Sequence, residues 1–441
     1  MADTLLIFSA VAGIIIAGFA GEQFFKKTGI PVFIFLILMG ILIGPVFGVF
    51  PRAPLLPSLG VFAELTLLMV LFYGGMDTKV SAVVKGGGRA FLQVTIYVIG
   101  STLAIGLVAY SLLRWDFIQS FIFASMIGGE TTAAVVIPLS RSLKLPEVTT
   151  AFLTLESAMN SIFSIVLFFA FVGVYETGAG SWIATLSGIA SNFSVGIVLG
   201  AILSMGWILI LHHYQQQKYT YVLTLGFVFA TYAVSTRLGG SGELSVLVFG
   251  IILGNYQLLN YLMKRQFNMD FLQRRLGIFQ EEISFLMETL FFVFLGLTFQ
   301  IDSSQVIGNL GIGGAMLGVL LLFRSAATEI STRNSELSLD RRTIILMCPQ
   351  GLVPATLAII AVNLGIPMAN SFLNIVTYVI ILTNIVAAAG AIFRLRRQKN
   401  SFEEFRAGLN EVYLQKKTEV IHTGRASTTG GRTLLFWRLG A

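Results

Sequence analysis

The chain has 441 residues, of which 55% are hydrophobic and 12% are charged, and it carries a formal net charge of +7 at pH 7. Soluble globular domains average about 45 to 50% apolar and about 25% charged residues, so this composition predicts an all-α polytopic membrane protein. A single cysteine, Cys348, excludes an internal disulfide framework, and no cluster of cysteine and histidine resembles a zinc site. We therefore expect no structural metal and no cofactor.

Thirteen segments are apolar and long enough to cross a bilayer, which takes about 20 mostly apolar residues per helix. They cover residues 4–21, 30–50, 60–76, 90–112, 116–139, 147–173, 191–211, 219–236, 243–259, 283–300, 306–326, 343–364 and 371–393. Two six-helix units, about 4–173 and 219–393, joined by the helix 191–211, would start on opposite sides of the membrane. That arrangement is typical of an inverted repeat. We expect one transmembrane domain, residues 1–393.

Basic residues predict the orientation of these helices. The loops on the C-terminal side of the membrane carry most of the lysines and arginines outside the tail, whereas the opposite loops carry only Arg52, Arg114 and Arg237. Because basic residues collect in cytoplasmic loops, this asymmetry places the C-terminus in the cytoplasm and the N-terminus outside. It also accounts for the positive charge, so the expected surroundings are a lipid bilayer and no nucleic acid partner. The first span lacks a basic start and a cleavage site, which favours a retained helix over a signal peptide.

The last segment, residues 394–441, predicts a short cytoplasmic tail. Phe402, Phe405, Leu409 and Val412 recur at helical spacing, which indicates a short amphipathic helix on the membrane or the cytoplasmic face. The stretch "HTGRASTTGGRT" beyond it is rich in Gly, Ser and Thr, so we expect it to be disordered.

Two spans are interrupted by helix-breaking residues. The fifth contains "MIGGETTAAVVIPL" (126–139) and the twelfth contains "MCPQGLVPATL" (347–357). Glycine weakens a helix and proline removes a backbone donor, so both places should expose backbone amides and carbonyls at membrane depth. Each is the fifth member of its six-helix unit. Paired interruptions at corresponding places point to the binding site of a transporter.

Polar side chains also occupy the sixth span, in "LESAMNS" (155–161). A charged residue at the bilayer centre costs about 2.5 to 3.5 kcal/mol on insertion scales, so Glu156 marks a candidate functional site. Glu156 and Asn160 lie one turn apart on the same helix face. Another acid, Glu64, lies in the third span, where we expect it to form a hydrogen bond in the core.

Five motifs in the same order resemble a known family. They are "FAELTLLMVLFYGGMD" (62–77), "AAVVIPL" (133–139), "LESAMN" (155–160), "EEISFLMETLFFVFLGL" (281–297) and "PQGLVPATLA" (349–358). Together they are similar to the monovalent cation:proton antiporter superfamily, especially its NhaP-like sodium/proton antiporters. The resemblance implies a homodimer in the cell membrane, with a dimerisation domain and a mobile core that contains two crossed, interrupted helices. It also implies exchange of sodium for protons by elevator-type alternating access.

The charged machinery of the family is matched only in part. Glu156, Ser157 and Asn160 match the sixth-span motif, and Arg324 matches an arginine that pairs with the sixth-span glutamate in the family. The ion-binding aspartate of that motif is replaced by Ser161.

Three further departures affect charged positions. Glu130 and Thr131 stand where relatives carry Thr-Asp or Thr-Ser, and Gln350 replaces a basic residue. Glu288 lies where related chains often have arginine. It would sit in a cytoplasmic funnel that attracts cations, or face water near its helix end.

The departures leave four interpretations open, because the Ser161 hydroxyl binds a cation but does not ionise. In the first, Glu130 is the titrating group, with Thr131, Ser157, Asn160 and Ser161 as neutral oxygen ligands, since burial favours a protonated carboxyl group. In the second, Ser161 is an introduced substitution that inactivates the transporter. In the third, the protein moves another substrate, or a cation without protons. In the fourth, it is a sensor that transports nothing.

Several roles also have a purely structural alternative. Glu156 and Arg324 form either a buried structural ion pair or part of the ligand set. Asn160 either bridges the two interrupted helices or binds the ion directly. An intramembrane protease is not expected, because no span has a His or Lys in its interior to serve as the base. The residues alone do not choose between sodium, lithium and potassium.

Overall fold

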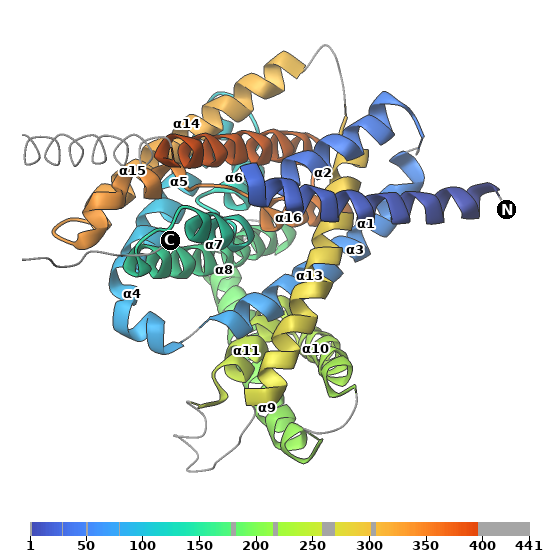
Figure 1. Cartoon of the computed structure of the whole chain (residues 1–441), viewed down its shortest axis with the longest axis vertical. Coiled ribbons are helices and arrows are strands. Elements are labelled where there is room, and N and C mark those ends of the chain that lie inside the picture. Colours follow the sequence, from blue (N-terminus) through green and yellow to red (C-terminus); the bar gives the residue numbers. More distant parts are fainter. Residues whose placement is uncertain are drawn as a thin grey trace, which may run out of the picture. The chain divides into compact units, whose positions relative to one another are not determined.

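A computed structural model describes residues 2–28, 30–49, 52–78, 80–177, 182–214, 219–257, 270–300 and 306–395 (Figure 1). These residues form helices and connecting turns, and none of them lies in a strand. The helices are α1 Ala2–Thr28, α2 Val32–Ile41, α3 Arg52–Asp77, α4 Val80–Val94, α5 Gly100–Ser111, α6 Phe117–Ile127, α7 Ala133–Ser142, α8 Glu147–Thr177, α9 Trp182–Tyr214, α10 Thr220–Arg237, α11 Gly242–Gly254, α13 Asp270–Thr298, α14 Val306–Ser331, α15 Arg341–Leu346, α16 Leu352–Asn363 and a last helix Ala369–Leu395. The all-helical class predicted from the sequence is confirmed.

Within the described ranges, five stretches of helix are long and apolar enough to cross a membrane by themselves. They are Gly87–Ser111, Glu147–Glu176, Ala190–Leu211, Val306–Ser331 and Ala369–Leu395, and six shorter apolar helices accompany them. The total of thirteen spans and the inverted repeat stay predictions. Helix ends differ from the predicted edges where the helix continues past its apolar part: α9 extends beyond the predicted span 191–211 at both ends. The predicted amphipathic helix of the tail lies outside the described residues.

Both predicted interruptions are present. The span 116–139 is divided into α6 and α7, and the span 343–364 into α15 and α16. Asp116 caps the start of α6, where its Oδ1 accepts from Ile118 N at 2.9 Å. At the end of α6, Gly129 has a φ of +77°, a conformation that favours glycine. A local sequence signal therefore accounts for the start of this half-helix and for its end.

Close contacts through glycine bring α3 against α11. A Cβ atom on Gly75 would lie 2.6 Å from the backbone oxygen of Leu247, so a larger residue would push the two helices apart. Small residues at such crossings let helix backbones approach closely in membrane proteins. Phe72 and Phe249 pack beside this contact, with ring centroids 6.1 Å apart.

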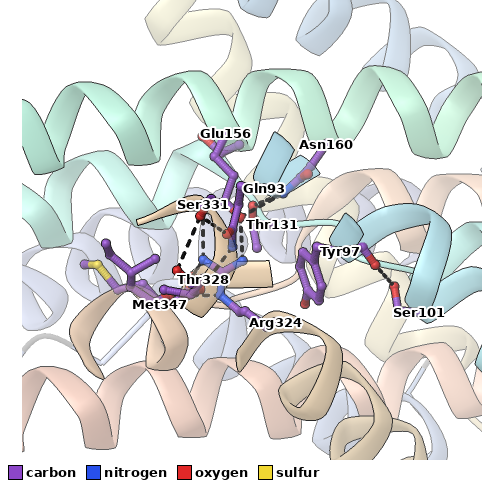
Figure 2. A network of polar contacts seen from close by, with 12 residues as sticks. Gln93, Tyr97, Ser101, Thr131, Glu156, Asn160, Arg324, Thr328, Ser331 and Met347 are labelled. Atoms are coloured by element: carbon purple, nitrogen blue, oxygen red, sulfur yellow. Dashed lines mark hydrogen bonds and ion pairs between the residues drawn. The ribbon is translucent and has the colours of Figure 1, made fainter. Parts of the chain in front are cut away.

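A second set of contacts positions the polar residues discussed below. α8 packs against α4, α6, α7 and α16, and α14 packs against α4, α5 and α15. The buried amide of Gln93 on α4 donates to Thr328 Oγ1 at 3.1 Å and accepts from Ser331 Oγ at 2.8 Å, both on α14 (Figure 2). Every polar atom of this link has a partner, so it fixes α4 and α14 relative to each other.

Candidate functional site

The two interruptions contact each other directly. Thr132 N, at the end of the first, donates to Pro349 O in the second at 2.8 Å. The side-chain amide of Gln350 donates to Ile127 O, the last backbone oxygen of α6, at 2.6 Å. Backbone groups freed at membrane depth require partners in the protein, and each interruption here supplies one for the other.

Glu156 and Arg324 form a buried ion pair between α8 and α14 (Figure 2). Arg324 Nη1 lies 2.6 Å from Glu156 Oε1, and Nη2 lies 3.1 Å from Oε2, so the pair is bidentate. Arg324 also donates to Ile344 O at 2.9 Å and to Met347 O at 2.6 Å, while its guanidinium lies 5.1 Å from the ring centroid of Tyr97. Both charges are therefore neutralised and hydrogen-bonded.

Glu130 is buried under different conditions. It is 1% exposed, and its carboxylate accepts two long hydrogen bonds, from Ser161 Oγ at 3.5 Å and from Gly351 N at 3.4 Å. Among the described residues, no lysine, arginine or histidine forms an ion pair with it. Two weak, uncharged donors leave oxygen lone pairs available, so this carboxyl group can hold a proton or a cation.

Asn160 joins α8 to the first interruption. Its Nδ2 donates to Thr131 Oγ1 at 2.8 Å and to Glu156 Oε1 at 3.3 Å (Figure 2), while its buried Oδ1 accepts from no donor among the residues that the structure describes. Of the two interrupted helices, the first is the one that Asn160 contacts by these hydrogen bonds, and whether it also binds the ion directly stays a prediction. The side chain of Gln350 connects the two interrupted helices directly.

The two serines of the α8 motif differ in their hydrogen bonds. Ser157 Oγ donates within α8, to Thr154 O at 3.1 Å, whereas Ser161 Oγ reaches both Ser157 O, at 3.2 Å, and Glu130. The structure therefore brings Ser161 to Glu130 and Thr131 to Asn160. Ser157 is buried on the same helix and forms no hydrogen bond with Glu130.

The acids outside this cluster have other neighbours. Glu64 on α3 accepts a hydrogen bond from the hydroxyl group of Tyr232 on α10, as expected for a core hydrogen bond. Glu288 on α13 is partly buried. Within the described part of the chain, neither forms a hydrogen bond or ion pair with the interruptions, and no group of three or more His, Cys, Asp or Glu there could bind a metal ion.

Sequence reasoning missed two residues of the last helix that hold the second interruption. Gln350 N donates to Thr383 Oγ1 at 3.2 Å, and Asn384 Nδ2 donates to Gln350 O at 2.7 Å. The signal was available, because Thr383 and Asn384 are adjacent polar residues inside the apolar span 371–393.

A family model described as "Sodium/hydrogen exchanger, transmembrane" matches residues 11–394. The chain belongs to the sodium/hydrogen exchanger family. This membership confirms the superfamily that the motifs indicated, and with the apolar helices it makes the chain an integral membrane protein.

Proteins similar to this chain in sequence include some named for potassium and some named for sodium. The K(+)/H(+) antiporter NhaP2 of Shewanella sp. strain MR-4 is 27% identical over 395 residues, which cover 85% of this chain and 64% of the relative. The Na(+)/H(+) antiporter NhaP of Pseudomonas aeruginosa is 24% identical over 340 residues, which cover 75% of this chain and 78% of the relative. The chain thus spans a little under two thirds of the NhaP2 relative's length.

A solved structure shares the fold of this chain. The sodium proton antiporter MjNhaP1 from Methanocaldococcus jannaschii at pH 8 matches with a TM-score of 0.76 and 20% sequence identity, over 90% of this chain and 99% of that one. An electron-microscopy structure of the same antiporter matches with a TM-score of 0.66 over 88% of this chain.

Proposed function

We propose that this protein exchanges a monovalent cation for protons, and that Glu130 is the carboxyl group that either ligand neutralises. The observation that carries the proposal is that Glu130 is buried at the contact between the two interruptions and forms no ion pair with any basic residue in the described part of the chain. An uncompensated charge is costly at membrane depth, so the empty, ionised site resists crossing the bilayer. Competition of a proton and a cation for one group then produces exchange.

Glu156 is the weaker candidate for this role. Its carboxylate is bound by both terminal nitrogens of Arg324, and removing one partner of such a buried pair leaves the other charge uncompensated. Protonation of Glu156 during each cycle would therefore isolate the arginine charge. We assign the pair to holding α8, α14 and α15 in place beside the site.

Neutral oxygens near Glu130 suit a partly dehydrated monovalent cation. Ser161 Oγ lies 3.5 Å from the carboxylate, and the buried Oδ1 atom of Asn160 accepts no hydrogen bond from the described residues. Thr131 Oγ1 is held by Asn160 Nδ2 at 2.8 Å. Gln350 contributes an uncharged amide, so no side-chain cation at that position competes with the transported ion. Ser157 is the remaining member of the proposed ligand set.

The finer features of the function follow from the resemblance to the antiporter superfamily. We propose elevator-type alternating access in a homodimer, in a cell membrane with the C-terminus in the cytoplasm. Relatives are named for potassium/proton and for sodium/proton exchange, so both ions need testing. Sodium is our first choice, because the motifs most resemble the sodium/proton antiporters.

The test is a measurement of internal pH in proteoliposomes after sodium or potassium gradients are imposed in either direction. The wild type should give a cation-dependent pH change that empty vesicles lack, and Glu130→Gln should abolish it, since glutamine cannot exchange a proton. Unchanged exchange by folded Glu130→Gln would remove Glu130 from the mechanism. If folded wild-type protein gives no pH change with either ion, the result would favour an inactive transporter, another substrate or a sensor.

A further inference from the structure

The backbone of the second interruption is held from outside its own segment. Gln350 N donates to Thr383 Oγ1 at 3.2 Å, and Gln350 O accepts from Asn384 Nδ2 at 2.7 Å. Both backbone polar groups of one residue are thus bound by two adjacent side chains of the last helix. All three residues are buried, so water does not replace these bonds without rearrangement.

The last helix also orients the two side chains that hold Gln350. The Thr383 hydroxyl donates to Val379 O at 2.8 Å, which leaves its lone pairs to accept from Gln350 N. One hydrogen of the Asn384 amide is directed to Ile380 O, at 2.8 Å, and the other to Gln350 O. Neither contact depends on a freely rotating group.

One rigid peptide group, the bond between Gln350 and Gly351, connects Asn384 to Glu130. The carbonyl group of Gln350 and the N–H group of Gly351 belong to the same peptide plane and point in opposite directions across it, because the bond is trans. Asn384 binds the oxygen on one side of this plane. On the other side, Gly351 N lies 3.4 Å from Glu130 Oε2.

We propose that Asn384, assisted by Thr383, is a positioning residue that aims the Gly351 N–H group at the Glu130 carboxylate. Asn384 does not touch the proposed ligands and acts through the peptide plane alone. The inference rests on the proposed role of Glu130 and extends it to a residue of the last helix. A preformed donor keeps the carboxylate in place before the cation arrives, so less order has to be gained on binding.

The experiment compares Asn384→Leu and Thr383→Val with two controls. Asn374→Leu removes a buried amide from the same helix, where its Oδ1 accepts from Gln300 N at 3.2 Å, away from the interruption. Thr383→Ser keeps the hydroxyl that Gln350 N requires. Size-exclusion profiles in detergent show which variants fold. If Asn384→Leu does not fold, Thr383→Val still tests the proposal.

Transport kinetics in proteoliposomes give the first readout. Asn384→Leu and Thr383→Val should raise the apparent KM for the cation roughly 3- to 10-fold, the effect expected for one lost hydrogen bond, with a smaller change in maximal rate. Asn374→Leu should keep the wild-type KM, and Thr383→Ser should restore most of the affinity. An unchanged or lowered KM in both test variants overturns the proposal, as does an equal rise in Asn374→Leu.

Infrared spectroscopy gives a readout that does not need transport. The carboxyl or carboxylate band of Glu130 is identified as the band that is present in the spectrum of the wild type and absent from that of Glu130→Gln. Its frequency should change in Asn384→Leu and Thr383→Val, because the hydrogen bond from Gly351 is lost, and should stay unchanged in Asn374→Leu. A wild type without exchange would refute the proposed function, whereas an unshifted band in the test variants would refute the positioning role.

Discussion

The side-chain amide of Gln350 donates to the backbone oxygen of Ile127 at 2.6 Å, and so joins the second interruption to the end of α6. The C-terminal end of a helix carries partial negative charge, which a neutral amide donor satisfies without adding a full positive charge. The next residue along the chain, Gly351, donates to Glu130. This contact leads to the first prediction.

Gln350→Arg should weaken cation binding. A guanidinium one residue away from the donor to Glu130 competes with the cation for the carboxylate, and we expect the apparent KM to rise roughly tenfold or more. The measurement is the cation dependence of exchange in proteoliposomes. Gln350→Leu is the companion variant, because it also loses the bond to Ile127 but adds no charge. Equal KM values for the two variants would contradict a charge effect.

Ser161→Asp should strengthen binding of sodium or create sodium dependence. The hydroxyl of Ser161 lies 3.5 Å from Glu130 Oε1, so an aspartate there would place two carboxylates together. Two such groups cannot both stay ionised without a bound proton or cation. The readout is the apparent KM for sodium against that for potassium. If neither the apparent KM for sodium nor that for potassium changes, the site has diverged from the chemistry of the family.

Arg324→Leu should destabilise the protein strongly. The substitution leaves Glu156 buried without its partner, which costs about 3 to 5 kcal/mol in comparable buried pairs. Thermal unfolding in detergent measures the loss as a lower midpoint temperature. The double variant Glu156→Leu with Arg324→Leu should recover much of the stability, because no charge remains uncompensated. A double variant as unstable as Arg324→Leu would show that the packing of the arginine dominates.

Gly351→Ala should disturb the contact between the interruptions. A Cβ atom on Gly351 would lie 2.7 Å from Thr132 Cβ, so one of the two segments has to move. Overpacking of this kind typically costs about 1 to 3 kcal/mol. We expect lower stability and slower exchange, and Thr132→Gly in the same protein should restore part of both. Failure of that second change to restore either would point to the backbone conformation of Gly351 instead of the clash.

The sequence was sufficient for features that depend on local chemistry. Gly129 and Pro349 mark the interruptions because each acts on its own backbone, and both interruptions are found where they were expected. The spacing of Glu156 and Asn160 placed them on one helix face, and their side chains lie 3.3 Å apart. Hydropathy was less informative about helix ends, because α9 continues where the residues are no longer strongly apolar.

The partners of the site residues could not be predicted in this way. The bond between Gln350 and Ile127 joins residues 223 positions apart, and no local pattern encodes which segments meet in space. The pairing of Glu156 with Arg324 came from the family resemblance and not from spacing. Thr383 and Asn384 were missed because a threonine and an asparagine in an apolar helix are common as packing residues, and their partner was unknown.

The four hydrogen bonds of Arg324 have a mechanical consequence. They tie the side chain of Glu156 on α8 to the backbone at Ile344 and Met347, on either side of the start of the second interruption. No one of these segments can shift by more than a fraction of a hydrogen-bond length without breaking buried, charge-assisted bonds. Any movement that changes access to Glu130 therefore has to carry these segments together as one rigid body and find its flexible joints elsewhere in the chain.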